Sequence, residues 1–315
     1  MQITEWHYLF RSTAMTANIL RTPEARFSVL PGFPYEPHYA EGLRGFEPLR
    51  LAYIDEGPRS AKTVFLCLHG EPTWSYLYRK MIPVFTAAGH RVVAPDFFGF
   101  GRSDKPVDEA TYTFSFHRDS LIRFIERLDL HNITLVCQDW GGVLGLTLPM
   151  DMPERFTRLL VMNTGIAVGG PVSEGFALWK SYAATIPEIP IAALITRDAR
   201  DAVNLMDAYA YEAPFPDSRY KAGVRRFPQI VPVEPGMDGV ELGKRARTFW
   251  ADHWRGDSFM AIGMRDSILG EPVMEYLRKQ IHGCGEPMRI EEAGHFVQEY
   301  GEPIARRALE VFGLG

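Results

Sequence analysis

The sequence predicts an α/β protein whose mostly parallel, twisted sheet is flanked by helices and interrupted by one inserted helical segment. Between residues 50 and 162, short β-branched apolar runs alternate with stretches of helical spacing. The alternation stops at about residue 164 and returns after residue 240. One run ends in a polar pair and two glycines, which indicates an abrupt turn from strand to helix. Parallel strands need crossover helices, and this arrangement places a site at the carboxyl ends of the strands.

The composition is that of an ordinary globular enzyme or binding protein. The 315 residues are 46% hydrophobic, enough for a large core with an inserted subdomain, and the net charge of −5 provides no basic surface for nucleic acid or an anionic membrane. No run approaches the roughly 18 apolar residues of a membrane span, and no signal peptide is apparent. The three cysteines form no metal-ligand cluster. We therefore expect a cytoplasmic protein with reduced thiols, no metal and no cofactor, and a small uncharged partner.

The first part of the chain supplies strands and helices in alternation. Strands are expected at 50–55, 63–69, 91–95 and 133–138, and helices at 75–88 and 116–130. The second of these helices carries Leu121, Ile122, Ile125 and Leu128 on one face, as an amphipathic helix does.

The second part contains the insertion. A strand at 158–162 is followed by a segment rich in Pro, Ala and Tyr, and regularity returns with strands at 259–263 and 288–290 and helices at 272–281 and 303–312. The predicted division is an N-terminal extension at 1–17, a main domain at 18–163 and 241–315, and a helical cap at 164–240.

The turn at Asp139 is the centre of the predicted site. Small residues at Cys137, Gly141 and Gly142 flank Asp139, as a strained elbow requires when its central side chain is pushed into the open. The pattern matches the G-x-S-x-G nucleophile elbow with an aspartate in place of the serine. An ionised aspartate needs no base to activate it. The alternative is that these residues form an ordinary turn at a strand end.

Two further groups follow in the order nucleophile, acid, histidine. The strand before the insertion ends without a carboxylate, so Asp266, after the next strand, is the candidate for orienting a histidine. His295 follows a short strand in Ala-Gly-His-Phe, whereas His282 ends a helix, so His295 is the better candidate base. In folds with a nucleophile elbow, the loop that corresponds to the one at Glu71 supplies one backbone N–H of the oxyanion hole. The other N–H is that of the residue after the nucleophile, here Trp140.

With these motifs the chain resembles the haloalkane dehalogenases of the α/β-hydrolase fold, specifically the subfamily whose halide site has two tryptophans. The resemblance runs from about residue 18 to the C-terminus. The resembling segments are LHGEPTWSY at 68–76, PDFFGFG at 95–101, VCQDWGG at 136–142, GFALW at 175–179 and AGHF at 293–296. Val143 stands where relatives carry a larger aromatic residue, so the size of the substrate pocket is expected to differ there.

The resemblance implies hydrolysis of a carbon–halogen bond through an alkyl ester on Asp139. A halide leaves as a stable anion, needs no general acid, and requires hydrogen-bond donors in a dry, apolar pocket. We expect Glu71 to be ionised and unable to donate, so Trp140 and the single cap tryptophan, Trp179, are the expected halide donors. Phe176, one turn before Trp179, is expected to line the substrate pocket. The expected partners are a small hydrophobic halogenated substrate, halide and water.

Two other functions are consistent with parts of the pattern. An epoxide hydrolase would use the same aspartate and base together with cap tyrosines as proton donors, and candidates are Tyr182, Tyr209, Tyr211 and Tyr220. A hydrolase-fold receptor would bind a small hydrophobic ligand without turnover. The complete set of Asp139, Asp266 and His295 argues against the receptor.

Overall fold

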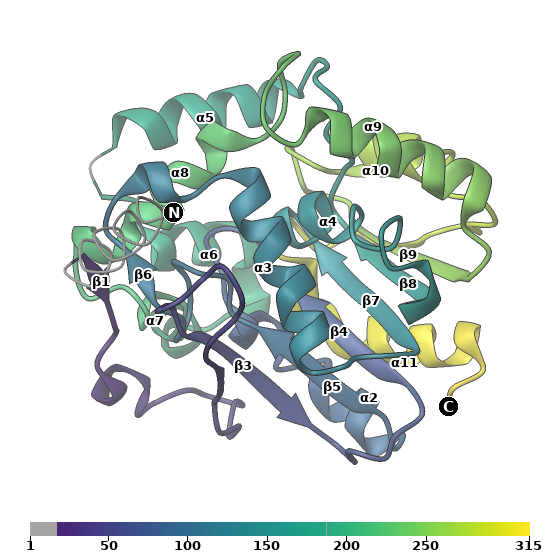
Figure 1. The fold of residues 1–315 in the computed structure, drawn as a ribbon, viewed down its shortest axis with the longest axis horizontal. Helices are drawn as coiled ribbons and strands as arrows, with labels where there is room; N and C mark the ends of the chain where they lie inside the picture. The colour runs from purple at the N-terminus through teal and green to yellow at the C-terminus, as the bar shows by residue number, and fades with distance from the viewer. Residues whose placement is uncertain (1–17, 187) are drawn as a thin grey trace, which may run out of the picture.

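The computed structural model describes residues 18–186 and 188–315, and the extension expected at 1–17 lies outside them. Among the described residues, an eight-stranded sheet has the order β10-β9-β8-β7-β4-β5-β3-β2 (Figure 1). Its strands are β2 (His38–Ala40), β3 (Leu51–Glu56), β4 (Val64–Leu68), β5 (Arg91–Pro95), β7 (Ile133–Gln138), β8 (Phe156–Met162), β9 (Asp257–Gly263) and β10 (Met288–Ile290). In this sheet the pairs β2–β3 and β3–β5 are antiparallel and the other five pairs are parallel, so the predicted mostly parallel sheet is confirmed.

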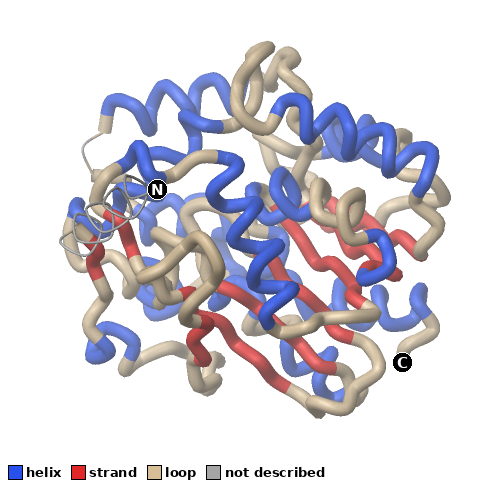
Figure 2. The backbone as a smooth tube through the Cα atoms, in the orientation of Figure 1, coloured by secondary structure: helices blue, strands red, loops and turns tan. Residues whose placement is uncertain are grey.

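Helices cover both faces of the sheet (Figure 2). In Figure 1, α3 (Phe114–Arg127) and α4 (Trp140–Gly145) cross in front of the strands, and α2 (Ile82–Ala87) and α11 (Gly301–Phe312) lie behind them. Helix α10 (Glu271–Arg278) connects β9 to β10. All residues of β4 and β7 are buried, as expected for central strands with helices on both faces.

One local expectation is corrected, and one strand pairing was missed. The helix expected at 75–88 is a 3₁₀ turn, η2 (Ser75–Tyr78), followed by the short α2, because Pro83 has no N–H and fits only within the first turn of a helix. The pairing of β1 (Ile19–Leu20) with β6 (Lys105–Pro106) was not predicted, since strands of two residues carry no recognisable periodicity.

The inserted segment is helical. Between β8 and β9 lie α5 (Glu174–Thr185), α6 (Ile191–Ala199), η5 (Arg200–Ala202), α7 (Leu205–Glu212), η6 (Ser218–Lys221), α8 (Ala222–Ile230), α9 (Val240–Thr248) and the π-helical turn η7 (Phe249–His253). Helices α5 to α8 lie at the end of the sheet toward which β7 points (Figure 1). We propose 164–240 as the bounds of this cap.

A buried polar network attaches the cap to the main domain. Both terminal nitrogens of Arg79 donate to the Glu299 carboxylate at 2.7 Å. From α7, the Tyr211 hydroxyl also donates to Glu299, and Asp207 accepts a hydrogen bond of 2.9 Å from Tyr76. The network therefore joins α7 to two segments of the main domain.

Candidate active site

Asp139 occupies the turn between β7 and α4 with backbone angles of φ 49° and ψ −126°, a conformation that non-glycine residues rarely adopt. The neighbouring glycines allow this turn. A Cβ on Gly141 would lie 1.9 Å from the Leu68 carbonyl oxygen, and one on Gly142 would lie 2.2 Å from Thr164 Oγ1. Strand and helix approach so closely that only glycine fits, and this holds Asp139 at the elbow.

Neighbouring strand ends fix the orientation of Asp139. Its N–H donates to the Asn163 carbonyl at 2.9 Å, and the Thr164 hydroxyl donates to the Asp139 carbonyl at 2.7 Å. The N–H of Glu71, in the loop after β4, donates to Asp139 Oδ1 at 2.8 Å. One carboxylate oxygen is thus held by a backbone amide at the position expected for an oxyanion hole.

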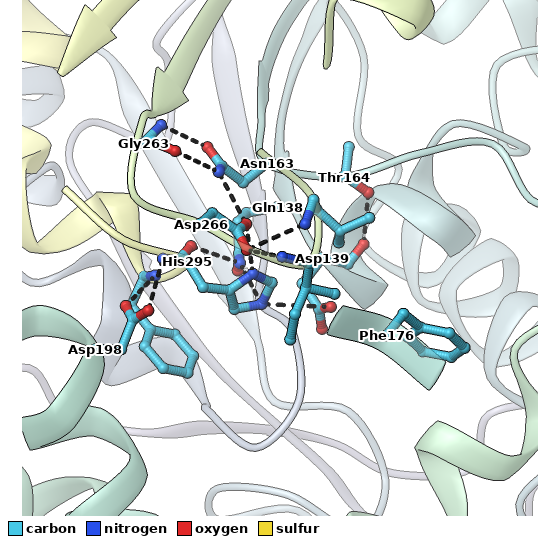
Figure 3. A network of polar contacts seen from close by, with 12 residues as sticks. Gln138, Asp139, Asn163, Thr164, Phe176, Asp198, Gly263, Asp266 and His295 are labelled. Atoms are coloured by element: carbon cyan, nitrogen blue, oxygen red, sulfur yellow. Dashed lines mark hydrogen bonds and ion pairs between the residues drawn. The ribbon is translucent and has the colours of Figure 1, made fainter. Parts of the chain in front are cut away.

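Asp266 and His295 form a hydrogen-bonded pair beside Asp139 (Figure 3). His295 Nδ1 lies 2.8 Å from Asp266 Oδ2, and the N–H groups of Ile268 and Leu269 donate to Asp266 Oδ1 at 2.7 and 3.1 Å. Burial opposes ionisation of Asp266, but the facing imidazole outweighs burial, and the pKa of this carboxyl lies below its usual value. The carboxylate therefore stays charged and orients the ring.

His295 lies between two carboxylates. Its Nε2 is 3.5 Å from Asp139 Oδ2, and its side chain is almost entirely buried. Burial alone would lower the pKa of His295, but Asp266 and Asp139 outweigh it and raise that pKa well above its usual value. While both carboxylates are ionised, the imidazole is therefore protonated at neutral pH.

Two side-chain amides in this cluster were not predicted from the sequence. Asn163 donates to Asp266 Oδ2 at 2.9 Å, and Gln138 donates to the His295 carbonyl at 3.0 Å while its amide nitrogen lies 3.0 Å from His295 Nε2. Each is a polar residue at the carboxyl end of a buried strand, Gln138 as the last residue of β7 and Asn163 directly after β8. That position was the available signal, but an amide at a strand end was not a candidate for the acid.

The surroundings of Glu71 oppose the ionisation expected for its carboxyl. Burial, followed by the neighbouring charge of Asp139, raises the pKa of the Glu71 carboxyl well above its usual value. His295 and the Trp179 indole, a hydrogen-bonding neighbour, oppose this rise without cancelling it. Glu71 Oε1 is buried and has no partner among the described residues. Glu71 therefore takes up a proton more readily than an exposed carboxyl, and in its protonated form it can donate a hydrogen bond.

A pocket of about 1000 Å³ opens above Asp139, between the sheet and the cap. Trp140 is the first residue of α4, is 3% exposed and packs against Phe227 of α8, with ring centroids 4.5 Å apart. Trp179 of α5 is partly buried and stacks on Tyr182 at 5.8 Å. The pocket is lined by the sequence-predicted residues Glu71, Asp139, Trp140, Val143, Phe176, Trp179 and His295. Asp266 lies behind His295.

Two absences hold for residues 18–186 and 188–315. These residues contain no cluster of His, Cys, Asp or Glu able to hold a metal ion. None of their helices is long and apolar enough to cross a membrane.

The fold and the site define a hydrolase of the α/β-hydrolase class, and residues 63–302 match the family model described as alpha/beta hydrolase fold. The haloalkane dehalogenase of Psychrobacter cryohalolentis is 42% identical over 93% of this chain and 97% of its own length. Haloalkane dehalogenase 1 of Mycobacterium tuberculosis is 42% identical over 93% of this chain and 98% of its own length. The chain belongs to the haloalkane dehalogenases.

A solved structure extends this similarity. The haloalkane dehalogenase from Paraglaciecola agarilytica NO2, described as tetrameric, has a TM-score of 0.92 and 62% sequence identity, covering 93% of this chain and 98% of that one. The similarity therefore includes the main domain and the inserted helices.

Proposed function

We propose that this enzyme hydrolyses haloalkanes to an alcohol, a halide ion and a proton through an alkyl ester on Asp139. The observation that carries the proposal is the elbow carboxylate of Asp139, which faces a pocket and lies 3.5 Å from His295 Nε2. Membership of the haloalkane dehalogenases supports the reaction, and the geometry supports the assignment of roles to individual residues.

In the first step, Asp139 displaces the halide. Its Oδ1 is held by the Glu71 N–H, so we assign the attack on the halogenated carbon to Oδ2. The carbon–halogen bond breaks as the new carbon–oxygen bond forms, and the halide leaves with the bonding electrons. No proton is transferred, so His295 has no part in this step.

The departing halide is held by the indole N–H groups of Trp140 and Trp179, as in the two-tryptophan subfamily. Both side chains border the pocket, which supports this assignment. Because indole only donates, it suits a halide. The raised pKa of Glu71 removes the argument that this residue cannot donate, so the case for Trp179 rests on its position in the pocket and beside Glu71.

In the second step, His295 acts as general base. Alkylation neutralises Asp139, one of the two carboxylates that raise the pKa of His295, so the imidazole loses its proton. The freed Nε2 then takes a proton from water. The hydroxide attacks the ester carbonyl, and the N–H groups of Glu71 and Trp140 stabilise the oxyanion. Its collapse breaks the bond between the carbonyl carbon and the alkoxide oxygen, which leaves as the alcohol with the proton held by His295, and the Asp139 carboxylate is restored. Trp140 begins α4, so its N–H has no partner within the helix.

The epoxide hydrolase alternative has weaker support in this pocket. Of the four candidate tyrosines, Tyr182 borders the pocket, whereas Tyr211 is buried and bonded to Glu299. Tyr209 and Tyr220 are not among the lining residues. Tyr276 of α10 also lines the pocket, but its side chain is largely exposed and lies outside the inserted helices. The four candidates therefore do not supply a pair of tyrosine donors to this pocket.

Halide and proton release on a panel of chloro- and bromoalkanes tests the proposed reaction, with terminal epoxides as the comparison. We expect one halide and one proton per alcohol formed. Turnover of the epoxides without halide release from any haloalkane would overturn the proposal.

A further inference from the structure

The cap contributes one carboxylate to the loop that carries the candidate base. Asp198, the penultimate residue of α6, accepts a hydrogen bond of 2.9 Å from the N–H of His295 through Oδ1 and one of 3.0 Å from the N–H of Phe296 through Oδ2 (Figure 3). A single side chain of the cap thus binds two consecutive backbone amides of the main domain.

The loop is shaped to admit this carboxylate. A Cβ on Gly294 would lie 2.4 Å from Asp198 Oδ1 and 2.6 Å from Oδ2, so the approach requires glycine. His295 and Phe296 are both buried. Loss of the acceptor of a buried N–H group destabilises the folded protein. The contact is therefore part of how the His295 loop is held in place.

The other contacts of His295 come from the main domain. Asp266 holds the ring at Nδ1, and Gln138 donates to the main-chain carbonyl. Asp198 supplies the acceptor for the main-chain N–H. The position of His295 relative to Asp139 therefore depends on the cap through this residue.

We propose that Asp198 is a positioning residue for ester hydrolysis, through which the cap holds the His295 backbone in register with Asp139. The inference rests on the proposed two-step function, in which His295 acts only in the second step. Loss of Asp198 should therefore slow hydrolysis of the alkyl-enzyme and leave its formation intact, since Asp139 is positioned by other contacts.

The test measures the two steps separately in Asp198→Ala and Asp198→Asn. Rapid-quench bromide release and intact-protein mass report alkylation and decay of the alkyl-enzyme. For Asp198→Ala we expect hydrolysis to slow by ~10-fold or more, alkylation to stay within about twofold, and kcat and KM to fall together. Asp198→Asn keeps one acceptor oxygen and should lie between the wild type and Asp198→Ala.

Asp201→Asn is the matched control. Asp201 lies three residues further on in η5, is exposed, and forms no hydrogen bond or ion pair with the described part of the chain. It should retain wild-type rates of both steps. Thermal unfolding of every variant establishes that the folded enzyme is being compared, and Asp198→Asn provides the test if Asp198→Ala does not fold.

Equal slowing of both steps in a folded Asp198 variant, or wild-type rates of both, would overturn the inference. Failure of the proposed function has a different signature, because the wild type would then release no halide or the His295→Phe variant would form no alkyl-enzyme. Either result would contradict the proposal that His295 acts only in the second step, on which the role of Asp198 depends.

Discussion

The charge on Asp139 sets the protonation state of His295. With Asp139 ionised, the imidazole faces two carboxylates and is protonated, which suits a resting state that needs no base. Esterification of Asp139 removes one of these charges and lowers the pKa of His295. In the proposed mechanism, formation of the alkyl ester therefore prepares the base that hydrolyses it.

This coupling predicts different pH dependences for the two steps. Hydrolysis of the alkyl-enzyme requires neutral His295, so its rate should fall as the pH drops through the pKa of His295 in the alkyl-enzyme. Alkylation transfers no proton to or from His295 and should stay constant over that range. Single-turnover quench measurements across pH follow both rates. A parallel fall of both rates would show that His295 takes part in alkylation.

Trp179→Phe should retain the apolar surface and remove one N–H donor. A hydrogen bond to a charged group contributes about 1.5–3 kcal/mol, so kcat/KM should fall by roughly one to two orders of magnitude. Halide binding, followed by quenching of tryptophan fluorescence, should weaken. Trp254→Phe is the control, because the Trp254 indole donates to Ser258 and does not border the pocket. Unchanged halide affinity in Trp179→Phe would place the second donor elsewhere, with Glu71 the first alternative.

At the scale of single residues, the sequence was sufficient to locate the candidate groups whose position along the chain carries a signal. Asp139 follows from the small residues around it, and Asp266 and His295 from their order at strand ends. Asp198 has no such signal, because it lies in the irregular cap and its partners are backbone amides distant in the chain. The raised pKa of Glu71 depends on burial beside Asp139, which no local pattern reports.

At the scale of helices and strands, a buried ion pair between Arg79 and Glu299 connects the end of η2 to η8 (Val297–Tyr300). Tyr211 extends this connection to α7 of the cap. Removing one partner of a buried ion pair leaves an uncompensated charge and costs about 3–5 kcal/mol. Glu299→Ala should therefore lower the free energy of unfolding by about 3 kcal/mol, near the low end because Asp207 still lies 3.5 Å from Arg79.

Chemical denaturation measures this change. Glu302→Ala is the control, because it removes an exposed ion pair to Arg306, for which a change of about 1 kcal/mol or less is expected. Equal stabilities of the two variants would show that the buried network does not anchor the cap energetically.

The strands and amphipathic helices were predictable because burial leaves a pattern in the sequence. A helix buried on one face has apolar residues at helical spacing, and a strand buried on both faces is a continuous apolar run. The central run at 133–138 and the strands at 91–95 and 288–290 match β7, β5 and β10 in the structure. The helix predicted at 75–88 was too long. Apolar spacing is continuous across Pro83, but proline fits only in the first turn of an α-helix, so α2 begins at Ile82. In the cap, the helices are short and joined by irregular turns, so the sequence indicated helical content without bounds.

For the molecule as a whole, the pocket lies where the main domain and the cap meet. The main domain supplies Asp139, Trp140 and His295, and the cap supplies Phe176 and Trp179. The likeness to the dehalogenase structure from Paraglaciecola agarilytica covers both parts. The alternation of strands and helices was enough to predict that the site lies at the carboxyl end of the sheet. The arrangement of the cap helices over that end of the sheet could not be predicted and is seen only in the structure.

The central claim is that displacement by Asp139 precedes, and does not need, the action of His295. The most direct measurement is a rapid mix of the His295→Phe variant with a reactive bromoalkane, followed by bromide assay and intact-protein mass. We predict a burst of about one bromide per active site, no further turnover, and an alkyl adduct on the peptide that contains Asp139. A mechanism in which histidine first activates the nucleophile predicts no burst. If the folded variant gave neither burst nor adduct on a substrate that the wild type turns over, the order of steps proposed here would be wrong.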